Sequence, residues 1–396
     1  MTRTIYFHIG LPKTGSTAIQ EYFKIYASLF LKHGISGLAR DGLGSHSDLA
    51  NYLLTLDHGT NQNIGLSHFS STNFDAPSTQ DYLFDSENKF SLFPSFEKCS
   101  KIFISSEHFH ELGSLGSRCV VDYAIKNNAN LSILAVVRPP QQWIWSVWGQ
   151  YTKSHWLDWH DFLEYANTKK IGFLSNILSP WIGQSNTSIT LLEYNKKKLV
   201  SNFLVKLGLP ISLIDNSESN FIVNKSLDPI GIVYQALLTK NILDCIAQMK
   251  RNQFFKPSSR YVHRLLLDFS DNSSATYEIS SLYRDKILQE QKVFCTDTSG
   301  LLSTYTQLWI EDALHFLNIA KDSIDEGSKQ QLEVVIDQAV KSNEVCQINL
   351  DKHDRLFPNR NFINHLPINA QFIGLSRCIA STILLASRSY KSQGSD

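Results

Sequence analysis

The feature that most constrains this chain is a short apolar segment followed at once by a glycine-containing loop and a helical pattern. Residues 4–9 are β-branched and aromatic, which predicts a buried strand. The loop and its flanks are written FHIGLPKTGST (7–17), and from Ser16 to Leu29 apolar residues recur every three or four positions. A strand, a glycine loop and a helix in this order predict a phosphate site made of backbone N–H groups and a helix N-terminus.

The lysine of this loop is not where loops that bind ATP or GTP carry it. Those loops follow the pattern G-x-x-x-x-G-K-[ST], with the lysine directly after the second glycine. Gly10, Gly15 and Thr17 keep their positions in that pattern. Ser16, however, stands where the lysine belongs, and the lysine is Lys13. An ammonium group at this place covers the loop itself. This position favours a donor shorter than a nucleoside triphosphate, with one phosphate and one transferable group.

Strand and helix patterns alternate through the first part of the chain. Further strands are predicted at 101–105, 131–137 and 188–194, and helices at 47–56, 141–154, 159–183 and 196–207. This alternation predicts an α/β fold, a P-loop-like three-layer structure with a doubly wound, central parallel sheet. The pattern is mostly helical afterwards. We therefore expect a core over residues 1–230 and a helical region over 231–396, which could form part of the same domain.

Charge and cysteine content exclude several classes of protein. Lys and Arg number 37, Asp and Glu also number 37, and the formal net charge is zero, so no overall field favours a nucleic-acid partner. The six cysteines show no metal-ligand or redox spacing, so we expect no metal site and a reducing, cytoplasmic location. The chain shows neither a leader pattern nor an apolar run long enough for a transmembrane segment.

The stretch PKTGST (12–17) after a strand resembles the 5′-phosphosulfate loop of the PAPS-dependent sulfotransferase family, in particular its bacterial carbohydrate-type members. That family transfers a sulfuryl group from 3′-phosphoadenosine 5′-phosphosulfate (PAPS) to a hydroxyl or amine, releases 3′-phosphoadenosine 5′-phosphate (PAP), and needs no metal. The resemblance covers residues 4 to about 230. It implies that the donor is bound by Gly10, Pro12, Lys13, Thr14, Gly15, Ser16 and Thr17, and that Lys13 stabilises the bridging oxygen during transfer.

A second cation is required for the 3′-phosphate of such a donor. Arg138 ends the strand at 131–137, and Ser146 follows eight residues later in the next helix, as in the family's 3′-phosphate motif. The planar guanidinium group suits two phosphate oxygens. Alone, an arginine at a strand end is typical of a solvated or salt-bridged residue. The resemblance also implies that Tyr194 lies near the adenine; alternatively, its ring packs under the following helix with its hydroxyl hydrogen-bonded.

The candidates for the base that takes the acceptor's proton follow the strand at 101–105. Glu107 and His108 are expected at the same edge of the sheet as the glycine loop, and family members place a Glu or His base in this region. We favour Glu107, although a histidine needs less tuning to act near neutral pH. His46 is a third candidate, with exposure at a helix start as its alternative role.

The acceptor is not defined by any motif. Five tryptophans between residues 143 and 159 could stack on sugar rings, but their helical spacing favours core packing. A saccharide or glycolipid hydroxyl is what the resemblance implies. The segment 372–390 could lie on a membrane, or more simply pack on the helical region. Two alternative functions stay open: an ATP-dependent small-molecule kinase of the P-loop class, and a nucleotide-binding scaffold without catalytic activity.

Overall fold

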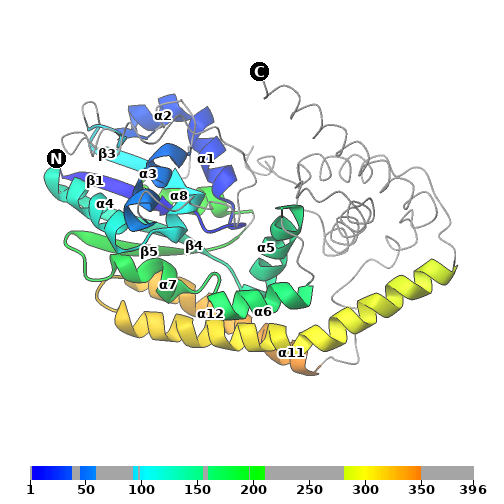
Figure 1. Ribbon diagram of the computed structural model, residues 1–396. Coiled ribbons are helices and arrows are strands. Elements are labelled where there is room, and N and C mark those ends of the chain that lie inside the picture. Colours follow the sequence, from blue (N-terminus) through cyan, green and yellow to red (C-terminus); the bar gives the residue numbers. More distant parts are fainter. Residues whose placement is uncertain are drawn as a thin grey trace, which may run out of the picture.

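Five parallel strands form the centre of the computed structural model, which describes residues 2–37, 45–58, 92–96, 99–154, 159–195, 197–209 and 281–348 (Figure 1). The strands are β1 (Arg3–Ile9), β2 (Ile35–Ser36), β3 (Lys101–Ser106), β4 (Ala129–Val137) and β5 (Thr187–Glu193). They lie in the order β2-β3-β1-β4-β5, and every neighbouring pair is parallel. This confirms the prediction of an α/β fold with a central parallel sheet.

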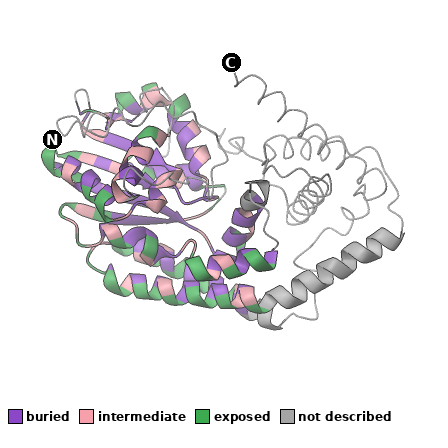
Figure 2. Cartoon of the chain, viewed as in Figure 1, coloured by how far each residue is buried: buried purple, intermediate pink, exposed green. Residues whose placement is uncertain are grey.

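Helices cover both faces of the sheet, which explains why its strands are apolar on both sides (Figures 1 and 2). Along β1, Ile5, Phe7 and Ile9 point to one face, and Tyr6 and His8 to the other. The core on the first face includes side chains of α3 (Ser47–His58), α4 (Ser114–Lys126), α5 (Pro140–Ser154), α6 (Trp159–Lys169), α7 (Leu174–Leu178), α11 (Ser281–Ile319) and α12 (Glu326–Ile348). The core on the second face includes side chains of α1 (Ser16–Ile25), α2 (Ala27–Lys32) and α8 (Leu199–Lys206).

The helix that the sequence predicted over residues 159–183 is divided by a turn between α6 and α7. Lys170 and Gly172 in this turn have positive φ angles of 49° and 77°. A Cβ atom on Gly172 would lie 2.4 Å from Cη2 of Trp143, so only glycine leaves room for that ring. The Trp143 ring therefore packs against the turn between α6 and α7, and the helical periodicity of the sequence did not reveal this turn.

The described part of the C-terminal region consists of α11 and α12, which share the core of the first face (Figure 1). The turn between them and the start of α12 occupy the outer edge of β5 through three hydrogen bonds. Ile189 N–H donates to Ser323 O (2.7 Å), Leu191 N–H to Ser328 Oγ (2.9 Å), and Glu193 N–H to Gln331 Oε1 (3.1 Å). These contacts satisfy edge groups that would otherwise be available to pair with another strand.

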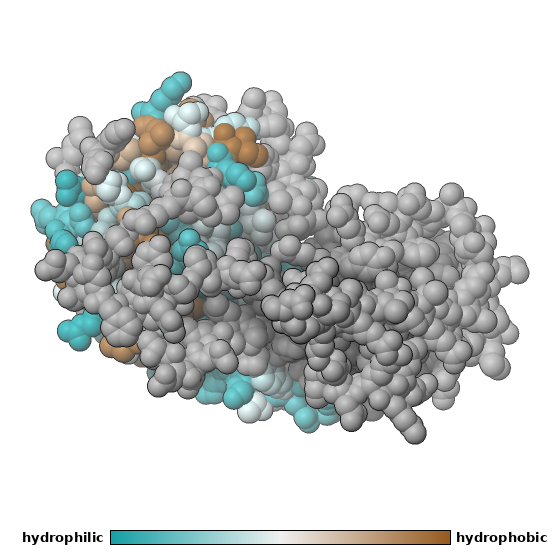
Figure 3. Space-filling model, turned by 45° about the horizontal axis from the view of Figure 1, so that its top comes forward, coloured by the Kyte–Doolittle hydropathy of each residue, from teal (hydrophilic) through white to brown (hydrophobic). Residues whose placement is uncertain are grey.

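The described surface carries no large apolar area in the orientation of Figure 3, where brown atoms form small patches among teal and white ones. Exposed apolar side chains such as Ile25, Leu31 and Leu115 are ordinary features of a protein surface. None of the described helices is both long and apolar enough to cross a membrane. The segments 210–280 and 349–396, with the pattern at 372–390, lie outside the described residues.

Candidate functional site

The loop at residues 10–15 joins β1 to α1 and contains two left-handed residues. Lys13 has a φ angle of 60° and Gly15 one of 88°. The Thr14 side chain stabilises this shape, because its Oγ1 donates to Leu11 O at 2.7 Å while its backbone N–H donates to the same oxygen at 3.3 Å. A left-handed conformation is uncommon for lysine and marks a backbone held by its surroundings.

Both glycines of the loop are required by close packing. A Cβ atom on Gly10 would lie 2.8 Å from Ser16 Oγ and 3.0 Å from Ser106 O. A Cβ atom on Gly15 would lie 2.2 Å from Leu199 Cδ2, at a φ angle that disfavours any other residue. The loop is therefore enclosed between the end of β3 and the start of α8.

Side chains from the β4–α5 segment hold two consecutive carbonyl groups of the loop. Trp143 Nε1 donates to Pro12 O at 2.7 Å, and Arg138 Nη1 donates to Lys13 O at 3.3 Å. The C=O and N–H of a trans peptide point in opposite directions, so the bond to Pro12 O turns the Lys13 N–H away from Trp143. Together with the first N–H groups of α1, which have no acceptor within the helix, this N–H can contribute to an anion cradle.

Glu107 lies beside the loop on the β3 side. It is the first residue of the short helix η3 (Glu107–Glu111), directly after β3. Thr17 Oγ1 donates to Glu107 Oε1 at 3.4 Å, a long contact. Burial lowers the pKa of Lys13, and the Glu107 carboxylate acts in the opposite direction. The structure thus brings a lysine, a hydroxyl and a carboxylate together at the carboxyl edge of the sheet.

His108 is next to Glu107 in sequence but has different contacts. Its backbone N–H bonds to Ser106 Oγ at 3.3 Å. Burial lowers the pKa of His108; Glu111 and Glu107 act to raise it and His110 to lower it. The imidazole is therefore neutral near pH 7 and chemically able to accept a proton. The hydrogen bonds described for the two residues connect Glu107, and not His108, to the first turn of α1 that follows the loop.

His46 is buried, with 3% of its surface exposed, so the alternative of a water-facing residue at a helix start is wrong. Its backbone N–H donates to Ser105 O at 2.7 Å, and its Nδ1 accepts from Ser105 N–H at 3.3 Å. These bonds fix the segment before α3 along β3 and give His46 a structural role there.

Arg138 is the centre of a second cluster, on the β4 side of the loop. Its Nη1 donates to Ser146 Oγ at 3.2 Å, and its Cζ lies 4.8 Å from the centre of the Tyr194 ring. Burial lowers the pKa of Arg138, with Tyr194 acting in the opposite direction. Arg138 Nε is buried and has no hydrogen-bond partner among the described residues. A buried donor of this kind is costly unless something binds it.

Tyr194 connects this cluster to the loop. Its backbone N–H donates to Val137 O at 2.7 Å, which continues the β4–β5 pairing by one residue. A Cβ atom on Gly15 would lie 3.5 Å from Tyr194 Cε2. The ring therefore lies beside both the loop and Arg138, and it packs against the core that includes α8, as the alternative of a ring under the following helix predicted.

The predicted site residues meet at one edge of the sheet, on both sides of the loop. Glu107 follows β3, Arg138 follows β4, and the loop follows β1 between them. Trp143 also contributes through its bond to Pro12 O, a contact that its place in a group of tryptophans at helical spacing did not indicate. The directly stacked Trp145 and Trp159, with ring centres 4.1 Å apart, do pack with the core; Trp156 lies outside the described residues.

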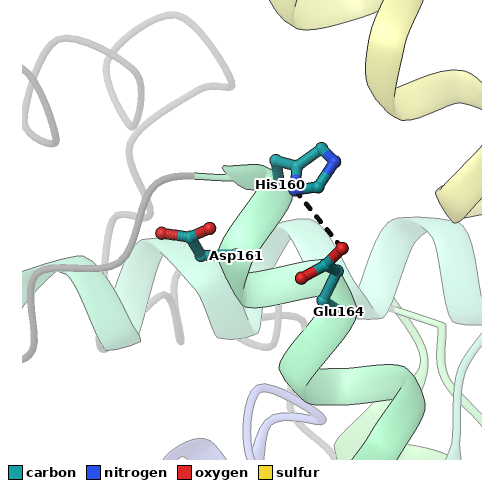
Figure 4. Close-up of side chains that lie close together, drawn as sticks. All are labelled: His160, Asp161 and Glu164. Atoms are coloured by element: carbon teal, nitrogen blue, oxygen red, sulfur yellow. Dashed lines mark ion pairs between the residues drawn. The ribbon is translucent and has the colours of Figure 1, made fainter.

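One group of potential metal ligands occurs within the described residues, on the first turns of α6 (Figure 4). His160 Nδ1 lies 3.9 Å from Glu164 Oε1, with Asp161 beside them. All three are exposed, as is common for charged residues on a solvated helix face. We assign no metal to this group.

Comparisons of the chain with protein-family models, with curated proteins and with solved structures gave no match.

Proposed function

We propose that this protein is a PAPS-dependent sulfotransferase with a P-loop-like three-layer core, acting on a hydroxyl of a saccharide or glycolipid. The observation that carries the proposal is the 3.3 Å contact between Arg138 Nη1 and Lys13 O, which joins two cation-bearing segments 125 residues apart. The chain runs from β1 to β2 on one side of β1, and from β3 to β4 on the other side. The strand order therefore reverses between β1 and β4, which makes this place a switch point of the sheet. Ligands of open α/β sheets bind at such points.

The described groups fit the two anionic ends of PAPS. The loop N–H groups and Lys13 suit the 5′-phosphosulfate, as in other anion cradles at helix N-termini. The unpartnered Nε of Arg138 suits an oxygen of the 3′-phosphate, with Ser146 beside it. Tyr194 offers an aromatic face between these two groups, where the adenosine would bind.

In the proposed reaction, Glu107 takes the proton of the acceptor hydroxyl while the acceptor oxygen bonds to sulfur. Lys13 stabilises the negative charge left on the 5′-phosphate oxygen when its bond to sulfur breaks. The Glu107 carboxylate acts to raise the pKa of Lys13, which is consistent with a base and a cation that serve the same reaction. His108, whose imidazole is neutral near pH 7, is the alternative base.

The contact between Thr17 and Glu107 favours one second candidate, a Mg²⁺-dependent kinase. In phosphoryl-transfer enzymes of the P-loop class, a loop hydroxyl and a strand-end carboxylate hold the metal together. The position of Lys13 argues against this function. Loops that bind ATP carry their lysine where this chain has Ser16, and from there the lysine reaches the outer phosphates. A scaffold that binds the nucleotide without turnover is the third alternative.

Thermal unfolding with PAP, Mg·ATP or no ligand separates these candidates. A ligand at about a hundred times its dissociation constant stabilises the folded state by ~2.7 kcal/mol. We expect PAP to raise the unfolding midpoint and Mg·ATP to leave it unchanged. The reverse ranking would favour the kinase. Stabilisation by PAP without sulfate transfer to any saccharide, lipid or phenol in a screen would favour the scaffold.

A further inference from the structure

Helix α12 contacts the residue that precedes Tyr194. Gln338 Nε2 donates to Glu193 Oε1 at 2.7 Å, and Gln331, seven residues earlier on the same helix face, accepts from Glu193 N–H at 3.1 Å. Both the side chain and the backbone of Glu193 are therefore held by α12. Because Tyr194 directly follows Glu193, these bonds fix the backbone position from which the Tyr194 side chain extends.

The same turn of α12 also contacts the segment that follows Arg138. Gln141 Nε2 donates to Ala339 O at 3.0 Å in a buried contact. Ala339 is adjacent to Gln338 in sequence, so one rigid helical turn binds both segments of the second cluster. A single rigid element that touches two parts of a site fixes their separation.

We propose that Gln338 is a positioning residue for recognition of the donor's 3′-phosphate, because it fixes the Tyr194 segment relative to Arg138. This inference rests on the proposed function and gives the C-terminal helix a role in donor selection. The bond from Gln338 is short and its acceptor is a carboxylate, both features of the stronger class of hydrogen bond. Its loss lets the Tyr194 ring move relative to the Arg138 guanidinium, which lies 4.8 Å from it.

Isothermal titration with PAP and with AMP, which lacks the 3′-phosphate, tests this role. We expect Gln338→Ala to weaken PAP binding about fivefold, the equivalent of one lost hydrogen bond, and AMP binding by no more than about twofold, because AMP shares the adenosine that faces Tyr194 but lacks the phosphate that Arg138 would hold. Gln330→Ala is the matched control, because Gln330 is exposed on the same helix. It should change neither affinity. An equal loss for PAP and AMP, or no loss for either, would overturn the proposal.

Variants at Glu193 make the test independent of the folding of Gln338→Ala. Glu193→Gln keeps an oxygen that can accept from Gln338, so we expect PAP affinity near that of the native protein. Glu193→Ala should lower PAP affinity as Gln338→Ala does, and the double variant should be no weaker than either, because both remove the same bond. Additive losses would contradict a shared role. If the proposed function itself is wrong, the native protein will bind PAP no more tightly than AMP, and this result is distinct from every outcome for the variants.

Discussion

The two sides of the glycine loop carry different chemistry. On the β3 side, Glu107 lies near Lys13 and Thr17, a set of groups suited to proton transfer and to charge developing in a reaction. On the β4 side, Arg138, Ser146 and Tyr194 form a set suited to holding an anion and a flat ring. Under the proposed function, we expect the β3 side to control the rate and the β4 side to control donor affinity.

The two sides are also supported differently. Beneath the β3 side, Ser105 Oγ lies 2.8 Å from His8 Nδ1 and accepts from Gln20 Nε2 at 3.0 Å, which links β1, β3 and α1 inside the core. The β4 side is supported instead by the indole of Trp143 and by α12. The support beneath the β3 side contains His8, a fully buried titratable group, so acid should weaken that support.

The largest expected effect is on the β3 side. We expect Glu107→Gln to reduce kcat by about 10²- to 10⁴-fold, the usual contribution of a general base, and to leave PAP affinity unchanged. Glu111→Gln, in the same short helix, is the control and should keep near-normal turnover. Sulfate-transfer kinetics together with PAP titration measure both quantities. If His108→Gln loses turnover while Glu107→Gln keeps it, the base is His108.

A large effect on binding is expected on the β4 side. Arg138→Lys removes the planar fork and its Nε donor, so we expect PAP affinity to fall about 10- to 100-fold while AMP affinity changes little. The exposed Arg118 on α4 provides the matched control, Arg118→Lys, which should change neither affinity. Equal losses for PAP and AMP would place Arg138 away from the 3′-phosphate.

Acid should weaken the support beneath the β3 side. Burial lowers the pKa of His8 to about 3, below its ordinary value of 6.5. Between these two pH values the unfolded chain binds a proton that the folded chain does not. The free energy of unfolding therefore falls as pH is lowered through this window, by about 1.4 kcal/mol per pH unit for this group.

Chemical denaturation at several pH values measures this dependence. His8→Asn retains a polar side chain next to Ser105 but cannot take up the proton, so its stability should fall less steeply below pH 6.5. Above that pH the two curves should run parallel. Parallel curves over the whole range would show that His8 does not contribute.

The smallest expected effect concerns the loop itself. Trp143→Phe keeps a buried ring but removes the donor to Pro12 O, so we expect PAP and AMP affinities to fall together, by about fivefold. Tyr123→Phe is the control, because it keeps a buried ring and removes a hydrogen bond to Pro94 O, away from the loop and from Trp143. It should lower stability without changing either affinity. If Trp143→Phe lowered PAP affinity and left AMP affinity unchanged, Trp143 would support only the Arg138 side of the site and not the loop as a whole.

Sequence patterns located most of the described core elements and the segments of the candidate site. The strands were found within two residues of their bounds, because both faces of each are buried and their apolar runs are continuous. The two-residue strand β2 was missed, since so short a run has no periodicity. The helix from Ser16 was predicted as continuous, whereas it divides at Tyr26 into α1 and α2.

The sequence by itself determined the glycine loop, because its residues are consecutive and their backbone requirements are local: two glycines, a strand before them and a helix after them. Only the tertiary structure decided which distant groups meet that loop. Trp143, Gln141 and Gln338 act through contacts between segments more than a hundred residues apart, and such contacts leave no local pattern. The physical reason is that strand order, set by packing across the whole sheet, determines which strand ends are neighbours.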